Sequence, residues 1–180
     1  MAALFLLALL LDGRAVVLQG VAGVQVFLFQ RADLFVLVID TQLVIAARLA
    51  EALGEPSAWV ELLRLAAPMH DVGKIGLSDE ALFMPVGSLS KELKNELMSH
   101  SIKGQNLFTS QPDMEAISTI IRHHHERFDG EGYPDGILNS VIPIGSRILA
   151  IAEDFDELQQ GWLAPKKLSE EEALSFVLKS

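Results

Sequence analysis

Cysteine is absent from the 180 residues of this chain. Its absence excludes a disulfide scaffold, a thiolate zinc site and a cysteine nucleophile. It also fits a reducing compartment, and we expect a cytoplasmic location. Any metal site in this chain must therefore be built from imidazole and carboxylate groups.

Positive charge is also scarce, because 14 lysines and arginines stand against 24 aspartates and glutamates, for a formal net charge of −10. Nonspecific binding to nucleic acid depends on clustered Lys and Arg that displace counterions, so we expect no DNA partner. A polyanionic substrate would have to be bound by metal ions and a few local basic residues.

The sequence also lacks an apolar run long enough for a membrane span. The run from Met1 to Leu11 stops at Asp12 and Arg14, well short of the roughly 20 residues that a span needs, and it lacks the basic start of a signal peptide. We expect a buried helix or strand here, or the remnant of a longer upstream segment, and no firm membrane segment. Residues 1–39 form an apolar N-terminal segment whose pattern fits short strands and buried helix equally, and we assign it no function.

From Thr41 the apolar residues repeat with the period of amphipathic helices. A first helix is expected to end at Gly54, and a second, bent by Pro68, runs into His70. Residues 77–87 are expected to form a loop. Ser90 and Ser169 are expected to cap two later helices at their N-termini. Another helix is expected after Pro143, with an inner stripe of Ile148, Ile151, Phe155 and Leu158.

A run of three histidines, His123 to His125, ends an apolar stretch and leads into a loop rich in glycine. Neighbouring histidines on a helix point about 100° apart, so two of them can reach one metal centre, or two adjacent ones, only at a helix end or a bend. Gly130, Gly132 and Pro134 end the helix at this point. The pattern indicates a metal site that opens onto a substrate loop, and the alternative is a solvated, histidine-rich helix end.

Two further stretches place metal-binding side chains near predicted helix ends. His70 and Asp71 could ligate two metals if Asp71 bridges them, with Lys74 in the same cavity; alternatively, His70 interacts with the helix dipole and Asp71 is a cap. His100 lies on an apolar stripe, where a buried imidazole needs partners for both nitrogens. It is therefore either a hydrogen-bonded core histidine or a ligand.

An acidic run lies on the predicted helix after Pro143. Most such runs are solvated faces, but Glu153 and Asp154 flank the apolar stripe closely enough for one of them to turn inward. The order along the chain is then His-Asp, His, His-His and an acidic residue. This order resembles the HD superfamily of metal-dependent phosphohydrolases, and the string His124-His125-Glu126 followed by Gly132-Tyr133-Pro134 resembles its HD-GYP branch, the bacterial cyclic di-GMP phosphodiesterases.

The resemblance, which covers residues from about 41 to about 174, implies an all-α HD-domain helical bundle over residues 40–180 that is short at its C-terminus. It also implies two divalent metal ions, three in some members, most often iron or manganese. The ligands that it implies are His70, Asp71 as the bridge, His100, His124, His125 and Glu153, with Asp154 as the alternative. Lys74 would contact the substrate phosphate, and the substrate side would include Tyr133 and Arg127.

The activity implied is hydrolysis of cyclic di-GMP to linear pGpG, and in some members to GMP, in bacterial second-messenger signalling. The partners implied are a cyclic dinucleotide, a sensory or diguanylate cyclase domain, and a second copy in a homodimer. Several positions depart from the family pattern. Asp40 and Leu43 replace a His and an Arg, Glu153 replaces an aspartate, Ser78 replaces a proline, and the segment 162–165 lacks the usual arginines.

These departures leave metal binding better supported than turnover, since arginine holds phosphate and guanine in a way that tryptophan and alanine cannot. Two alternatives to the phosphodiesterase therefore stay open. One is a catalytically weak regulatory or binding module, and the other is an HD phosphohydrolase that acts on another nucleotide.

Overall fold

A computed structural model describes residues 15–19, 25–29, 36–39, 41–84, 86–161, 163–164 and 166–179. The chain divides into two compact units, Met1–Thr41 and Gln42–Ser180. The apolar run Met1 to Leu11 lies outside the described residues, so the prediction for it stays open. Among the described residues, no helix is long and apolar enough to cross a membrane.

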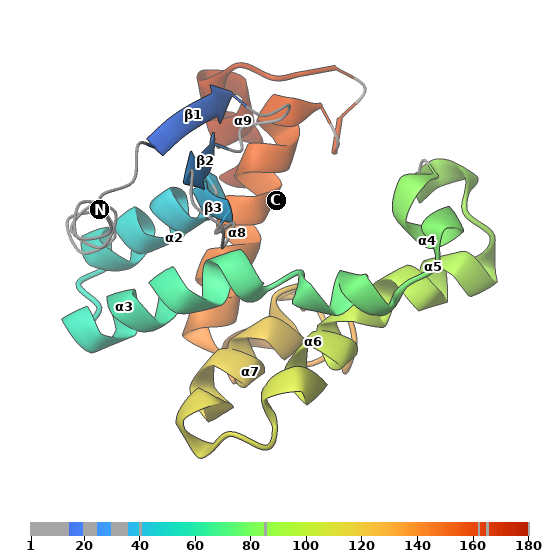
Figure 1. Cartoon of the computed structure of the whole chain (residues 1–180), viewed down its shortest axis with the longest axis horizontal. Coiled ribbons are helices and arrows are strands. Elements are labelled where there is room, and N and C mark those ends of the chain that lie inside the picture. The colour runs from blue at the N-terminus through green and yellow to red at the C-terminus, as the bar shows by residue number, and fades with distance from the viewer. Residues whose placement is uncertain are drawn as a thin grey trace. The chain divides into compact units, whose positions relative to one another are not determined.

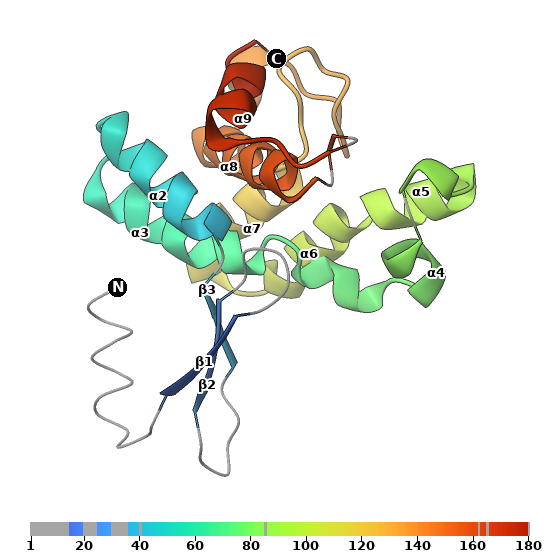
Figure 2. The same ribbon diagram turned by 90° about the horizontal axis from the view of Figure 1, so that it is seen from above.

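The first unit contains an antiparallel sheet of three strands in the order β1-β2-β3. The strands are β1 (Ala15–Gln19), β2 (Gln25–Phe29) and β3 (Val36–Ile39) (Figure 2). Pattern alone could not separate strands from buried helix here. The choice of strand agrees with the many β-branched and aromatic residues in these segments.

The described residues of the second unit form helices joined by loops and contain no strand, as expected for an all-α bundle. Its α-helices are α2 (Thr41–Ala52), α3 (Ser57–Ala66), α4 (Asp79–Phe83), α5 (Lys91–Met98), α6 (His100–Phe108), α7 (Glu115–His123), α8 (Ile144–Gln160) and α9 (Glu170–Val177). Short 3₁₀ turns connect them: η1 (Ala67–Met69), η2 (Val72–Gly76), η3 (Val86–Ser88), η4 (Pro112–Met114) and η5 (Asn139–Val141). Helices α2 and α3 run alongside each other, and α4 and α5 form a hairpin at the far end of this unit (Figures 1 and 2).

The core of this unit lies where α2, α3, α7 and α8 meet, and its largest fully buried side chains include Leu63, Ile120, Ile121 and Leu149. Ile151 was expected on the inner stripe of α8, but it is 42 % exposed. The buried face of α8 instead follows two four-residue rows, one through Ile148, Ala152 and Asp156 and one through Gly145, Leu149 and Glu153. This rotation turns Glu153 inward.

Several helix ends follow from local chemistry. Gly54 has φ +78°, the left-handed region that ends helices, and the hydroxyls of Ser90 and Ser169 accept backbone N–H groups as predicted. The expected loop 77–87 is wrong for residues 79–83, which form α4. Ser78 caps this helix and also donates to Glu96 on α5.

Two glycines allow η2 and α6 to cross at very short range. A Cβ on Gly73 would lie 1.9 Å from the carbonyl oxygen of His100 and 2.5 Å from the backbone nitrogen of Gly104. A Cβ on Gly104 would lie 2.8 Å from the side chain of Ile121 on α7. Only hydrogen fits at these positions. The crossing brings the segment that contains His70 and Asp71 against the start of α6.

Candidate metal centre

Four histidines from distant parts of the second unit converge on one place. His70 follows η1, His100 begins α6, and His124 and His125 follow α7. The ring centroids of His124 lie 5.1 Å from His70, 5.3 Å from His100 and 4.0 Å from His125. The structure therefore brings together imidazoles that the sequence spreads over more than fifty residues.

The backbone orients three of these rings in the same way. Nδ1 of His70, His100 and His124 donates to the carbonyl oxygen three residues earlier, at 2.5, 2.6 and 2.6 Å. A neutral imidazole has one N–H, so in His100 and His124, whose pKa values lie below the ordinary value, these bonds leave a lone pair on Nε2. The Nε2 atoms of His100 and His124 lie 3.3 Å apart. Each of these atoms has a lone pair and no hydrogen, so neither ring can donate a hydrogen bond to the other.

Two carboxylates lie among the rings. Asp71 places Oδ2 3.4 Å from Nε2 of His70 and Oδ1 3.4 Å from Nε2 of His100. Glu153 places Oε1 3.8 Å from Nε2 of His70 and Oε2 3.8 Å from Nδ1 of His125. Glu153 is buried and belongs to one of the groups of candidate ligands, whereas Asp154 is half-buried and belongs to none of them, so Glu153 is the better candidate of the two.

The donor atoms form two groups that could each hold a cation: His100, His124 and His125 in one, and His70, His124 and Glu153 in the other. Within each group the atoms lie within 4.8 Å of one another. Nε2 of His70 and Oδ1 of Asp71 are buried with no hydrogen-bond partner, which is rare for polar atoms in protein interiors. The residues present therefore fit divalent cations, which would satisfy both the unpaired atoms and the facing lone pairs.

Burial and neighbouring charges shift the pKa values of the cluster. Burial opposes the charge of His70, but the nearby carboxylates of Asp71 and Glu153 outweigh it and raise the pKa of His70 to about 9. Burial raises the pKa of Glu153 to about 8. Burial also lowers the pKa of His125 to about 3 and the pKa values of His100 and His124 below their usual value. These three imidazoles are therefore neutral near pH 7, the form that binds metals.

Lys74 and Tyr133 border the cluster. Nζ of Lys74 donates to Oδ2 of Asp71 at 2.5 Å, and the side chain of Lys74 is 36 % exposed, so the ammonium is open to solvent. The ring of Tyr133 stacks on His125 with centroids 4.7 Å apart. Gly132 permits this approach, because a Cβ there would lie 2.2 Å from the backbone nitrogen of Arg127.

Other positions singled out in the sequence are not among the donor atoms of these two groups. Arg127, expected on the substrate side, is 53 % exposed, and its Nε lies 4.0 Å from Asp129. Leu43 packs against the core and has no ligand atom, while Asp40, Trp162 and Pro165 lie outside the described residues.

One residue, Glu126, was named in the HD-GYP string but was given no role there. The Glu126 side chain is fully buried and accepts two backbone N–H groups of the glycine-rich loop. Its position directly after the histidine run was the available signal.

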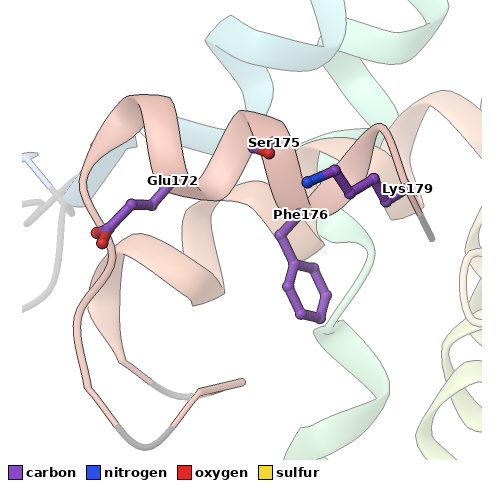
Figure 3. Close-up of a pocket in the computed structure, with 4 residues that line it drawn as sticks. All are labelled: Glu172, Ser175, Phe176 and Lys179. Carbon is purple, nitrogen blue, oxygen red and sulfur yellow. The ribbon is translucent and has the colours of Figure 1, made fainter.

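A separate hollow lies on α9, lined by Glu172, Ser175, Phe176 and Lys179 (Figure 3). Phe176 lies on α9, Lys179 lies just beyond its end, and the carboxylate of Glu172 accepts the backbone N–H of Ser169 in the helix cap. This hollow shares no residue with the histidine cluster.

Comparison with known proteins agrees with this geometry. The model of the HD domain family matches residues 26–179. The chain belongs to the HD domain family. Curated relatives of this HD-domain chain include the cyclic di-GMP phosphodiesterase response regulator RpfG of Xanthomonas campestris, 38 % identical over 63 % of this chain and 30 % of the relative. A cyclic di-GMP phosphodiesterase of Thermotoga maritima is 35 % identical over 70 % of this chain and 35 % of the relative.

A 3'3'-cGAMP-specific phosphodiesterase 2 of Vibrio cholerae is 34 % identical over 62 % of this chain and 22 % of the relative. The solved structure of the HDG"Y"P protein Bd1817 of Bdellovibrio bacteriovorus shares the fold with a TM-score of 0.60 at 24 % identity, covering 77 % of this chain and 44 % of that one. The resemblance to HD-GYP proteins is thereby confirmed. The chain spans about a third or less of the length of these curated relatives.

Proposed function

We propose that the helical unit is a metal-dependent phosphodiesterase that hydrolyses cyclic di-GMP to linear pGpG. The observation that carries the proposal is the pair of facing Nε2 lone pairs on His100 and His124, 3.3 Å apart beside unpaired atoms of His70 and Asp71. Such an arrangement costs free energy unless a cation lies within it. The names of the curated relatives support the choice of a cyclic dinucleotide as substrate.

Two metal positions follow from the donor atoms. His70 and Glu153 would bind one ion, and His100 and His125 would bind the other, with His124 within reach of both groups. Asp71 directs one oxygen toward His70 and the other toward His100, as a bridging carboxylate would. The mixture of imidazole and carboxylate supports iron or manganese as the metal.

Paired divalent ions, when bound, lower the pKa of water and neutralise charge that develops on phosphoryl oxygens. The chain itself contributes orientation and one further positive charge. Lys74, held at Asp71, presents its ammonium to a phosphate at the exposed edge of the cluster. Positive charge placed where the phosphoryl oxygens become more negative stabilises the transition state. Tyr133 would form the rim of the substrate site.

The direct test is an assay of purified protein, reconstituted with Mn²⁺ or Fe²⁺, for the linear dinucleotide. Cyclic di-GMP and 3'3'-cGAMP are compared as substrates. We expect turnover that disappears in His124→Ala, whose fold is checked by circular dichroism. Turnover that survives in His124→Ala would place the activity outside this cluster.

A regulatory module that binds metal and cyclic dinucleotide without turnover is the second candidate. It is favoured by the exposed side chain of Arg127, whose Nε lies 4.0 Å from Asp129, and by the sequence of residues 162–165, which lacks arginine. Binding of cyclic di-GMP by metal-loaded protein without product would support this candidate. A homodimer, a sensory or cyclase partner domain and a cytoplasmic location stay predictions.

A further inference from the structure

His125 is held differently from the other three histidines of the cluster. The rings of His70, His100 and His124 each donate to a backbone carbonyl. Within the part of the chain that the structure describes, the ring of His125 has no such bond, and its Nδ1 lies 3.8 Å from Glu153, beyond hydrogen-bond distance. A metal ligand normally has its ring fixed by a second group.

The group that contacts the His125 ring is the ring of Tyr133. The two rings stack at 4.7 Å with an interplanar angle of 25°. The backbone N–H of Tyr133 also donates to the carbonyl oxygen of His125 at 3.1 Å. The orientation of His125 therefore depends on where the loop places Tyr133.

Glu126 fixes the part of the loop that follows Tyr133. Its carboxylate accepts the backbone N–H of Asp135 at 2.7 Å and the backbone N–H of Ile137 at 3.1 Å. The side chain of Glu126 is 0 % exposed, and hydrogen bonds from N–H groups to a buried carboxylate are strong.

Arg122 fixes the same segment from the helix side. Its Nε and one terminal nitrogen donate to the two carboxylate oxygens of Asp135 at 2.7 and 2.6 Å. Its other terminal nitrogen donates to Gln105 on α6 at 2.8 Å. A bidentate pair of this kind is both strong and directional, so it ties the loop to α6 and α7 in one geometry.

We propose that Glu126 and the Arg122–Asp135 pair are positioning residues that hold Tyr133 against His125 and thereby orient this ligand of the second metal position. This inference deepens the proposed function and rests on it, because His125 must be a ligand for its orientation to matter. We call Glu126, Arg122 and Asp135 the loop clamp.

A third metal site is the competing interpretation, since His123, Glu126 and Asp135 place ligand atoms within 4.8 Å of one another. The hydrogen bonds decide against it. Both oxygens of Glu126 already accept backbone N–H groups, and both oxygens of Asp135 accept Arg122. These carboxylates have the partners that a cation would otherwise supply.

Two measurements test the loop clamp without relying on turnover. Tyr133 is the single tyrosine of the chain, so protein labelled with ¹³C-tyrosine gives one set of ring resonances whose shifts report the stacking on His125. Titration with Mn²⁺, followed by electron paramagnetic resonance of the free ion, reports the affinity of each metal position.

In Glu126→Gln one backbone N–H loses its acceptor, because the amide NH₂ of glutamine cannot accept a hydrogen bond. We expect the Tyr133 resonances to move and one of the two Mn²⁺ sites to weaken about 10- to 100-fold, the usual effect of removing a group that orients a ligand. The site with His70 and Glu153 should keep its affinity. Glu131→Gln, an exposed change in the same loop, is the matched control and should alter neither measurement.

Tyr133→Leu provides a second test if the buried change at Glu126 prevents folding. It should weaken the same single Mn²⁺ site, whereas Tyr133→Phe keeps the stacked ring and should restore the affinity. Unchanged tyrosine resonances in Glu126→Gln would overturn the proposal. Displaced resonances with both Mn²⁺ affinities unchanged would also overturn it.

These outcomes are distinct from failure of the proposed function. Wild-type protein that binds two Mn²⁺ ions but releases no linear dinucleotide contradicts the phosphodiesterase, and the comparison of variants still decides the role of the loop clamp. Wild-type protein that binds no Mn²⁺ overturns both proposals.

Discussion

The two sides of the histidine cluster are held by different means. On the side of His70, His100 and His124, helix ends supply the rings and backbone carbonyls orient them. On the side of His125, a loop supplies the contacts, and side chains orient the ring through Tyr133. The first side should therefore respond to changes in backbone spacing, and the second to side chains that touch no ligand. The predictions below test this difference.

The largest effect is expected from Gly73→Ala, which acts on the side held by backbone. The added methyl would overlap the carbonyl oxygen of His100 at 1.9 Å, so η2 and α6 must separate. We expect a loss of about 3 kcal/mol in the free energy of unfolding, at the upper end for overpacking, together with loss of tight metal binding. Urea unfolding measures the first quantity. Gly87→Ala, where no atom lies within 4 Å of the added methyl, is the control, and equal stability of the two variants would contradict the close crossing.

A slightly smaller effect is expected from Glu153→Gln, which removes a charged ligand atom but keeps the size of the side chain. Binding of Mn²⁺ at the position shared with His70 should weaken by about 100-fold, since second-shell changes alone cost 10- to 100-fold. Asp154→Asn changes the neighbouring residue, which belongs to none of the candidate metal groups, and should leave the affinity as it is. The reverse result would show that Asp154 is the ligand.

Lys74→Gln should lower the rate of catalysis without changing metal binding. Loss of the ammonium removes charge stabilisation from the phosphate, which typically costs about 100-fold in kcat, while the stoichiometry of bound metal stays the same. The measurement is steady-state turnover of cyclic di-GMP beside metal analysis of the same sample. Lys94→Gln on the exposed face of α5 is the matched control. Loss of metal in Lys74→Gln would indicate that the lysine mainly positions Asp71.

The smallest effect concerns pH in the absence of metal. The pKa of His70 is raised to about 9 in the folded protein from an ordinary 6.5. The stabilisation that this proton gives is therefore fully present below pH 6.5 and is lost as the pH rises through 9. Glu153, with its pKa raised to about 8, acts in the same direction. Metal-free protein should therefore lose stability as the pH rises from 7 to 9. Thermal unfolding of metal-free and Mn²⁺-loaded protein should show a drop only in the former, and a rise in the metal-free protein would contradict the shifted pKa values.

The helical fold and the meeting of the histidines could be predicted from the sequence. Helix periods and the caps at Ser90 and Ser169 are local signals that the structure confirms. The predicted ligands His70, His100, His124, His125 and Glu153 do come together in two groups of potential donors, and their role as ligands stays a prediction. Short elements were harder to predict. The helix α4 is only five residues long, too short to show a period, and the strands of residues 15–39 have apolar runs that fit either structure.

The other features of the site depend on contacts between residues far apart in the sequence, which no local pattern predicts. Glu153 and Asp154 flank the same stripe, and only the rotation of α8, which exposes Ile151, determines which of them faces His70. The loop clamp joins Glu126 and Arg122 to backbone and side-chain groups nine to thirteen residues away. The same holds for Arg127, whose turn toward Asp129 could not be read from its place beside the motif.

Anomalous diffraction from crystals of the Mn²⁺-loaded protein tests the central claim most directly. The account predicts two manganese peaks on either side of Asp71, one near His70 and Glu153 and the other near His100 and His125. A cluster without manganese, or histidine rings turned away from a common centre, would contradict it.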